Sequence, residues 1–484
     1  MASSAQPTVG RAARPLASLV AIMLAVMLVG GAIGCGSPRP EAAHRALVRD
    51  AILPTTLRLD ADDANARTDA AETIRRTQPV LRAALGEPTT RRTIVWQLSP
   101  EGLERFLGRI GQDANTGAAT LVARGTPEIF LQRPMPTATA EGDAAQRLRA
   151  EFVLAHEYTH AWLGAHVPLT SRSDLEEGLA NWVGLASLED RSIGGVRFDG
   201  PRRLAIAMTR LTARTDAPIT VAALLRARGE DAYVFGTSLF LWLADEARDM
   251  AAFSAVTRRA ISPLGVHAND LSRHLQTIAA SDAPEPPVED RFRNWLDRTD
   301  AAARTWWAPL GYVAIGTHDD GRVLLADSES IVAMSFGDPA ALPADARALD
   351  LEKGLPPFDR VTEVTVRVRG GDAVVDPAFR HESIRTGLAI VSGQSRGVPS
   401  AAIRLREGEA VELRVEGVDL VAAIDGRPIA RWEGAACQLF AVASIGQLPD
   451  GRLPVVEVSR GLPGGTGNRA SAVAEKSKSK LASP

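Results

Sequence analysis

The sequence predicts an α+β protein, in which a mainly helical region with a small sheet is followed by an all-β region. From Asp143 to Leu296 nearly every segment has the period of 3.6 residues that is typical of helices. Beyond about residue 305, apolar residues recur at every second position instead, as they do in half-buried strands. The chain of 484 residues is too long for one ordinary domain of about 150 residues, so we expect two or three domains.

The composition favours a folded globular chain that has no nucleic-acid partner. Hydrophobic residues make up 45% and charged residues 23%, which is unlike a disordered chain or one with many membrane spans. The 55 basic and 58 acidic side chains give a net charge of −3. Because this balance provides no excess of positive charge for a polyphosphate backbone, we expect no binding of nucleic acid.

The first 35 residues predict export from the cytoplasm. Two arginines precede an apolar run from Leu16 to Ile33, and small residues then lead to Cys35, which is how a secretion signal is built. The segment resembles a bacterial lipoprotein signal, which implies that residues 1–34 are removed and that Cys35 carries a lipid anchor in the cell envelope. The alternatives are a signal cleaved from a secreted protein and an uncleaved anchor helix, since about 18 apolar residues is the lower limit for spanning a bilayer.

Cysteine usage gives no sign of a disulfide framework. The chain has two cysteines, Cys35 and Cys437, which are too few to staple a protein of this size. We expect Cys437 to be a small, buried core residue.

Ahead of the helical region, the sequence predicts a tether and N-terminal helical segment over residues 35–90 and then a small sheet. The local signals are an alanine-rich first helix, a serine cap on the second helix, and Gly125-Thr126-Pro127 as the turn of a hairpin. The expected elements are a helix at 63–85, a strand at 93–96, a helix at 99–111, hairpin strands at 118–122 and 128–131, and a last helix around Phe292 and Trp295.

The all-β region at 305–463 predicts a β-sandwich. The segments 364–368 and 411–415 alternate apolar with polar residues, as strands with one buried face do. Asp425-Gly426 predicts a hairpin, because these two residues suit the positive φ angles of a type I′ turn. Residues 464–484 are rich in Gly, Ser, Ala and Lys, so we expect a disordered tail.

The chemistry is predicted by the five residues from His156 to His160, which read His-Glu-Tyr-Thr-His. Residues i and i+4 of a helix lie on one face about one turn apart, so both histidines can direct a ring nitrogen at one zinc ion. Glu157 lies beside them, where its carboxylate can take a proton from a metal-bound water. The alternative is a helix with two surface histidines, but the apolar residues around the motif favour a buried, metal-bearing helix.

A catalytic zinc site has three protein ligands and one open position, so we expect a third ligand. His166 lies six residues after His160, which is the interval of the metzincin pattern H-E-x-x-H-x-x-G-x-x-H. That pattern needs glycine at position 163 to turn the chain, whereas this sequence has Leu163 there and Gly164 one residue later. A displaced glycine would misdirect His166, and the alternative for this residue is a place near the helix end, where the helix dipole favours it.

Glu177 is the second candidate for the third ligand. Ser173 and Glu176 have the spacing of a capping box, which predicts that a new helix begins at Ser173 and gives Glu176 a structural role. Glu177 faces about 100° away from Glu176 and can approach the first helix from the side. Asn181 follows four residues later on the same face, where it can hydrogen-bond the outer nitrogen of a ligand histidine. The alternative for Glu177 is an acidic residue stabilised by the helix N-terminus.

These motifs together resemble the gluzincin metallopeptidases, especially the aminopeptidase N-like branch. The resemblance covers residues 91–300. The segments that carry it are His156-Glu157-x-x-His160, Glu177-Gly178-Leu179-Ala180 and Tyr233-Val234-Phe235-Gly236.

The resemblance implies a zincin-like catalytic domain with Zn²⁺ as its cofactor. His156, His160 and Glu177 would be the zinc ligands, Glu157 the general base, and Tyr233 the donor to the oxyanion of the tetrahedral intermediate. The hairpin near 128–131 would match the edge strand that aligns an extended substrate. The alternative for Tyr233 is an aromatic ring that packs on the apolar helix at 239–243.

Two departures from the gluzincin pattern bear on the activity. The exopeptidases of that branch carry Gly-x-Met-Glu-Asn on the edge strand to hold the free amine of the substrate, and the segment 125–129 does not match it. We therefore expect an envelope-anchored endopeptidase or a narrow-specificity protease that hydrolyses a peptide or protein substrate with a metal-activated water. Asn181 stands where thermolysin-like members have Asp, and a neutral partner would polarise the ligand histidine less.

The alternative function is a catalytically silent surface lipoprotein of zincin fold, whose β-sandwich binds a glycan or a protein partner. Loss of a metal ligand would favour this alternative, and none is lost. A purely structural zinc site is disfavoured, because Glu157 is intact and the sequence offers no fourth ligand to close the site.

Overall fold

The computed structural model describes most of the chain between residues 44 and 460, with gaps, and leaves the two ends outside. The described residues are 44–48, 50–59, 63–109, 118–123, 125–164, 173–203, 205–206, 209, 221–225, 232–247, 249–261, 286–302, 307–309, 315–318, 321–326, 331–335, 363–376, 402–433 and 439–460. The predicted signal, Cys35, His166, Cys437 and the predicted tail lie outside these ranges. Within them, no helix has the length and apolar character that crossing a bilayer requires.

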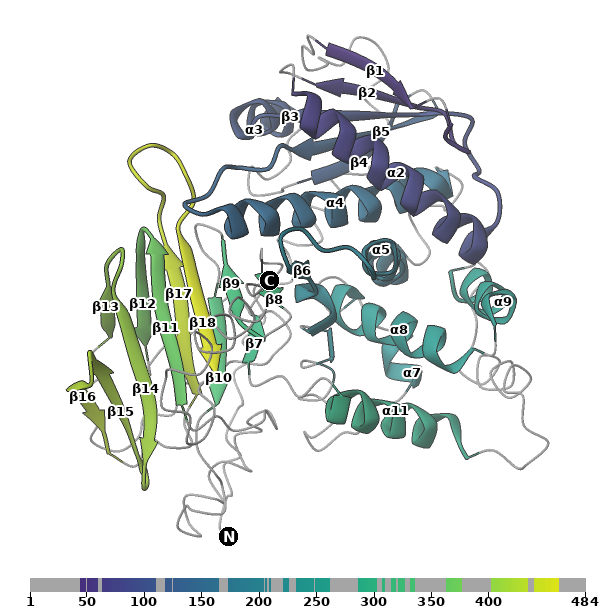
Figure 1. Ribbon diagram of the computed structural model, residues 1–484. Coiled ribbons are helices and arrows are strands. Elements are labelled where there is room, and N and C mark those ends of the chain that lie inside the picture. The colour runs from purple at the N-terminus through teal and green to yellow at the C-terminus, as the bar shows by residue number, and fades with distance from the viewer. Residues whose placement is uncertain are drawn as a thin grey trace, which may run out of the picture.

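A five-stranded sheet lies at the top of the molecule in Figure 1. Its order is β1-β2-β3-β5-β4, where β2, β3 and β5 run parallel and β4 pairs antiparallel with β5. Gly125, with φ of 74°, makes the turn of the expected β4–β5 hairpin. The sequence analysis did not predict β1 and β2, which lie in the segment expected to be a tether. The strands are β1 (His44–Val48), β2 (Thr55–Leu59), β3 (Thr93–Leu98), β4 (Ala118–Ala123) and β5 (Thr126–Gln132).

β1 and β4 are the two edge strands of this sheet, and β4 is the one that contacts α4 through Thr120. β5 pairs with β3 on one side and with β4 on the other, so within the hairpin that was matched to the edge strand, β4 lies at the edge and residues 128–131 lie inside. The physical reason is burial, because Ile129 to Leu131 are at most 5% exposed and fit the middle of a sheet. Residues 118–121 are only half-buried, as an edge strand allows.

Helices cover both faces of the sheet. α2 (Ala64–Leu85) and α4 (Ala140–Leu163) lie on one face and share a hydrophobic cluster with the strands. α3 (Pro100–Arg109) packs on the other face, in a smaller cluster that includes Trp96 and Phe130. The helix that bears the His-Glu-Tyr-Thr-His motif is therefore buried beneath the sheet, as the apolar residues around the motif predict.

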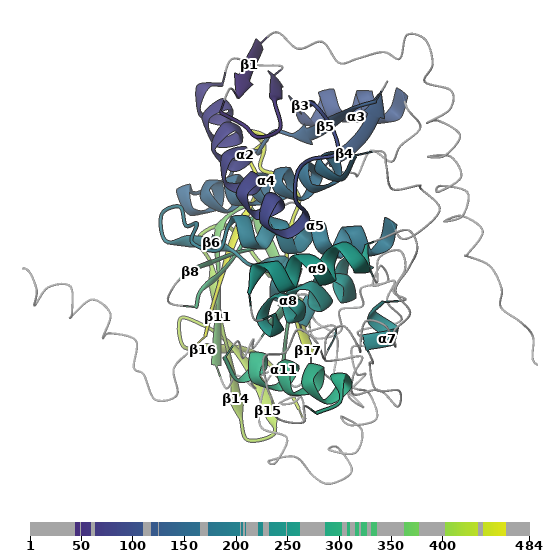
Figure 2. The same ribbon diagram turned by 90° about the vertical axis from the view of Figure 1, so that its right-hand side faces the viewer.

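The remaining helices pack on the side of α4 that faces away from the sheet (Figures 1 and 2). They are α5 (Ser173–Ser187), α7 (Val221–Leu224), the π-helical segment η2 (Ala232–Gly236), α8 (Thr237–Glu246), α9 (Met250–Ala260) and α11 (Val288–Ala302). The strand β6 (Val196–Phe198) is an exception to the expected all-helical stretch. α5 begins at Ser173, as the sequence predicts.

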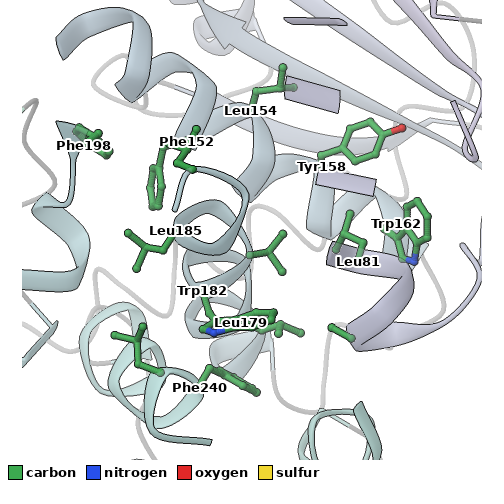
Figure 3. Close-up of a cluster of buried hydrophobic side chains, with 14 of the residues drawn as sticks. Leu81, Phe152, Leu154, Tyr158, Trp162, Leu179, Trp182, Leu185, Phe198 and Phe240 are labelled. Carbon is green, nitrogen blue, oxygen red and sulfur yellow. The ribbon is translucent and has the colours of Figure 1, made fainter. Parts of the chain in front are cut away.

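Tyr158 attaches α4 to the rest of the core from the face opposite the two histidines. In Figure 3 its ring points away from α5, whereas Phe152 of the same helix lies beside α5. The Tyr158 hydroxyl lies 2.7 Å from the Thr55 hydroxyl and accepts a hydrogen bond from Gln78 Nε2 at 2.7 Å. Burial raises the pKa of this phenol well above its ordinary value. Because both partners are buried as well, α4 is fixed to β2 and α2.

The C-terminal region consists of two antiparallel sheets, an eight-stranded one and a five-stranded one. Residues of both sheets form one hydrophobic cluster, which includes Val366 of β11, Val375 of β12 and Val442 of β17. Asp425 and Gly426 have φ angles of 51° and 72°, so the predicted hairpin turn is confirmed. The eight strands in order are β16 (Arg427–Trp432), β15 (Asp419–Ile424), β14 (Ala410–Glu416), β11 (Glu363–Gly370), β18 (Val455–Arg460), β9 (Val323–Leu325), β8 (Ile315–His318) and β6; the five are β13 (Ile403–Leu405), β12 (Asp372–Asp376), β17 (Leu439–Ile445), β10 (Ile331–Ser335) and β7 (Trp307–Pro309).

The β region is packed directly against the first turns of α4. β6, from the helical region, pairs with β8 of the eight-stranded sheet, and Gln146 of α4 donates a hydrogen bond to the Ala326 carbonyl oxygen. At Gly142 a Cβ would lie 2.4 Å from Thr137 Oγ1 and 2.6 Å from Val455 Cγ2, both closer than real Cβ contacts come. Glycine at this position therefore lets β18 approach α4.

Gly142 provides a test of this contact. We expect Gly142→Ala to lower the free energy of unfolding by about 1–3 kcal/mol, because the added methyl group overpacks the junction. Gly108→Ala in α3 is the matched control, since a Cβ there meets nothing within 4 Å. That change should raise the free energy of unfolding by about 0.5–1 kcal/mol through helix propensity. Urea unfolding of both variants measures the two signs, and equal effects would argue against the close junction.

Candidate metal centre

α4 and α5 bring His156, His160 and Glu177 together. The histidines lie one turn apart on α4, and Glu177 comes from the first two turns of α5. Glu177 Oε2 is 3.2 Å from His156 Nε2 and 3.5 Å from His160 Nε2, and the two Nε2 atoms are 3.3 Å apart. Over the described part of the chain, these three side chains are the group of potential ligands close enough to share a metal ion.

The spacing of these atoms fits a tetrahedral metal ion. Zinc binds nitrogen and oxygen ligands at about 2.0–2.2 Å, and atoms at the corners of such a tetrahedron are about 3.3–3.6 Å apart. The three observed separations run from 3.2 to 3.5 Å. Three ligands leave the fourth corner free, which is the arrangement of catalytic zinc sites.

The electrostatics of the three side chains also suit a cation. Glu177 Oε2 is buried and makes no well-directed hydrogen bond to either imidazole. Burial opposes the charged form of Glu177, yet His160 and then His156 hold the pKa of the carboxyl well below its usual range. Burial also opposes a charged His160, but the Glu177 carboxylate and Glu176 raise the pKa of its imidazole well above the ordinary value. The buried carboxylate thus requires a positive charge, which a metal ion can supply in place of a proton.

Asn181 fixes the orientation of His156. Its Oδ1 lies 2.9 Å from His156 Nδ1, while its Nδ2 donates to the Tyr233 carbonyl oxygen at 3.2 Å and to the Thr237 hydroxyl at 2.9 Å. Because the amide hydrogens are directed at these oxygens, Oδ1 accepts from Nδ1–H, and the Nε2 lone pair is left for the metal centre. This is the contact that the sequence predicts for Asn181.

Glu176 lies at the outer nitrogen of His160, a role that the sequence analysis did not assign to it. Its Oε2 is 3.9 Å from His160 Nδ1 and contributes to the raised pKa of that histidine. Glu176 Oε1 is buried and has no hydrogen-bond partner among the described residues. His160 therefore has an acidic neighbour, whereas His156 has a neutral one. The signal that could have found this residue is the pair of adjacent acidic residues at the start of a helix that faces the metal-bearing helix.

Glu157 is held by the free edge of the sheet. Thr120 of β4 donates its hydroxyl to Glu157 Oε2 at 2.6 Å, and the same hydroxyl lies 3.2 Å from the Glu157 carbonyl oxygen. The Glu157 carboxylate is close enough to His160 to contribute to its raised pKa. No sequence signal predicts the contact, because it joins a strand and a helix that are 37 residues apart.

Tyr233 lies beside the histidines on η2. Its ring is stacked on that of His156, with the centroids 6.1 Å apart and the planes 9° from parallel. Gly178 of α5 and Gly236 of η2 are in backbone contact, since a Cβ on Gly178 would overlap Gly236 and lie 2.7 Å from the Thr237 nitrogen. These two glycines thus let α5 and η2 approach closely enough for Glu177 and Tyr233 to lie beside the same two histidines.

A buried ion pair braces the two ligand-bearing helices. Glu151 of α4 is 3% exposed and accepts hydrogen bonds from Arg191 Nε and Nη2 at 3.1 and 2.9 Å. Arg191 follows α5 by four residues, and Arg76 of α2 lies 3.5 Å from the same carboxylate. Removing one partner of a buried pair typically costs about 3–5 kcal/mol, so this contact restrains how α2, α4 and α5 cross.

α4 ends one residue later than the metzincin pattern requires, because that pattern turns the chain at position 163. The helix continues through Leu163, and Gly164, with φ of 65°, donates its N–H to the His160 carbonyl oxygen as a C-cap. His166 lies outside the described residues. Among the residues that the structure describes, Glu177 is the third potential ligand beside the two histidines.

Comparison with known proteins does not assign this chain to a family. No protein family matches the sequence, and no curated protein matches it. Among solved structures, the chain is similar to an aminopeptidase A from Legionella pneumophila in complex with aspartic acid, at 13% identity and a TM-score of 0.32. The match covers 79% of this chain and 37% of that protein, so this chain spans little more than a third of its length. A likeness this low supports no statement about the fold or the function of this chain.

Proposed function

We propose that this chain is a zinc metallopeptidase with a zincin-like catalytic domain that hydrolyses peptide bonds. The observation that carries the proposal is the triangle formed by His156 Nε2, His160 Nε2 and Glu177 Oε2, with separations of 3.2 to 3.5 Å and a carboxylate, that of Glu157, beside it. The buried Glu177 oxygen requires a positive charge beside it, and a divalent cation bound by the three side chains would supply that charge.

The chemistry divides between the ion and the side chains. A zinc ion bound there supplies Lewis-acid activation of a water and of the scissile carbonyl. Glu157 accepts a proton from the attacking water and passes it to the leaving amine, so it acts first as base and then as acid. Tyr233, whose ring is stacked on His156, donates to the oxyanion that forms on the carbonyl carbon. Asn181 and Glu176 hold the ligand histidines from behind.

The edge strand supports internal cleavage rather than removal of N-terminal residues. A peptide that adds to the sheet would pair with β4, because β4 carries the free edge beside α4. β4 reads Ala-Ala-Thr-Leu-Val-Ala and contains no carboxylate to hold a free α-amine. We therefore propose an endopeptidase or a narrow-specificity protease that acts on extended segments of peptides or proteins. The two C-terminal sheets, which share one core, would form the β-sandwich that accompanies it.

Glu157→Gln tests the catalytic step. The amide cannot accept the proton but keeps the size of the carboxylate, so hydrolysis should fall by about 10²–10⁴-fold or more while about one zinc per chain is retained. Cleavage of a quenched-fluorescence peptide library and metal analysis of the same sample measure both quantities. If the wild-type protein binds zinc and cleaves nothing, the silent-lipoprotein alternative, with a glycan or protein ligand for the β region, replaces the peptidase.

Three further variants test the ligand set. Glu177→Ala should lower zinc affinity sharply, because an oxygen ligand at about 2.0–2.2 Å is lost. Asn181→Ala should lower it about 10–100-fold, as expected for a group that orients a ligand. His166→Ala is the matched control and should leave zinc affinity near the wild-type value. Competitive titration with a chromogenic chelator ranks the variants, and a ranking with His166 first would favour the metzincin ligand set instead.

The location of the protein is proposed on the sequence of its first 35 residues alone. We propose a lipid anchor on Cys35 in the bacterial cell envelope. When expressed in a bacterial host, the protein should enter the detergent phase, and Cys35→Ala should abolish acylation while Cys437→Ala keeps it. Mass spectrometry of the mature N-terminus identifies the lipid. Membrane attachment without lipid on residue 35 would indicate an anchor helix.

A further inference from the structure

We propose that Thr120 is a positioning residue for the general base, and that β4 thereby aligns both the base and the substrate. The inference rests on the proposed peptidase function and deepens it. The Thr120 hydroxyl donates to Glu157 Oε2 at 2.6 Å, which is the length of a charge-assisted hydrogen bond from a hydroxyl to a carboxylate.

The strand holds the Thr120 hydroxyl rigidly. Thr120 pairs with Ile129 of β5, which is fully buried, and the neighbouring residues Ala119 and Leu121 pack into the cluster on the opposite face of the sheet. Since successive side chains of a strand alternate between the faces, anchoring these two neighbours directs Thr120 toward α4. Its β-branched side chain adds stiffness at χ1.

The bond leaves Glu157 able to act. A carboxylate has two oxygens, and only Oε2 receives the Thr120 proton, so Oε1 is available to accept the proton of an attacking water. Without the hydroxyl, a glutamate side chain has three rotatable bonds and loses conformational entropy whenever it adopts the reactive geometry. Thr120 therefore contributes to orientation of the base and not to binding of the metal. Its hydrogen bond goes to Glu157, whereas the close contacts among His156, His160 and Glu177 do not involve it.

The position of Thr120 on the free edge gives this contact a second consequence. A substrate strand that pairs with β4 has its register set by the same backbone that carries Thr120. β4 then positions both the base and the scissile bond, so the two are not displaced relative to each other. Misplacement by about 1 Å can lower a rate by roughly 10²-fold, so such an arrangement has measurable value.

The test uses the full-length, zinc-loaded protein and the best-cleaved peptide of a quenched-fluorescence library. Thr120→Val is nearly isosteric and removes only the hydroxyl, so we expect kcat to fall roughly 10–100-fold with KM and zinc content unchanged. Thr120→Ser retains the hydroxyl and should remain within about threefold of wild type. Thr126→Val is the matched control, because it makes the same change in the same hairpin at a hydroxyl that faces Arg92.

A second measurement tests the contact without relying on activity. In zinc-free protein, the shifts in thermal midpoint caused by Thr120→Val and by Glu157→Ala should not add, and the double variant should fall short of the sum by about 2 °C. Additive shifts overturn the contact. A Thr120→Val variant as active as wild type, or a Thr120→Ser variant as slow as Thr120→Val, overturns the positioning role alone. A wild-type protein that binds zinc and cleaves nothing overturns the peptidase proposal, and the role of Thr120 with it.

Discussion

The crossing of α4 and α5 is the constraint on which the rest of the site depends. At this crossing, two imidazole nitrogens and one carboxylate oxygen lie within 3.5 Å of one another, and all three are atoms that carry lone pairs. Such atoms repel one another unless a proton or a cation lies among them. The surrounding structure has to keep all three groups at one point, where the Glu177 carboxylate favours a positive charge on or between the imidazoles. This requirement explains several features that are otherwise unrelated.

The crossing is held by contacts of three different kinds. Tyr158 fixes α4 from behind with buried hydrogen bonds, and the Glu151–Arg191 ion pair ties α4 to the segment after α5. Gly178 and Gly236 bring the start of α5 against η2 by removing the side chains between the two backbones. None of these contacts uses the side chains of His156, His160 or Glu177, so the candidate ligand atoms themselves need not supply the energy that positions them. That separation leaves the fourth corner of the site free for chemistry.

The sequence predicts the local parts of this site better than its non-local parts. His156 and His160 are on one helix, so a spacing of four residues is enough to place them together. The start of α5 and the Asp425-Gly426 hairpin are likewise local signals, and the structure agrees with both. Strand order has no such local signal. The hairpin near 128–131 was expected to match the edge strand, but which of its two strands lies at the edge depends on the pairing of β5 with β3, a parallel and long-range contact. The sequence gives no signal for Thr120 for the same reason, since the proposed role of this residue depends on β4 being the edge strand beside α4.

The change of period near residue 305 marks a change of secondary structure, but the contacts continue across it. β6, at residues 196–198, pairs with β8, at residues 315–318, so one sheet contains strands from both sides of that point. β18 reaches Gly142, at the beginning of the helix that carries the histidines, and β6 follows the helix that carries Glu177. Both ligand-bearing helices are therefore in contact with, or continuous with, the β region at one end. It follows that the β region helps to support the candidate metal centre, because removing it would uncover Val196, which lies against Gly316 of β8, and would free the first turns of α4.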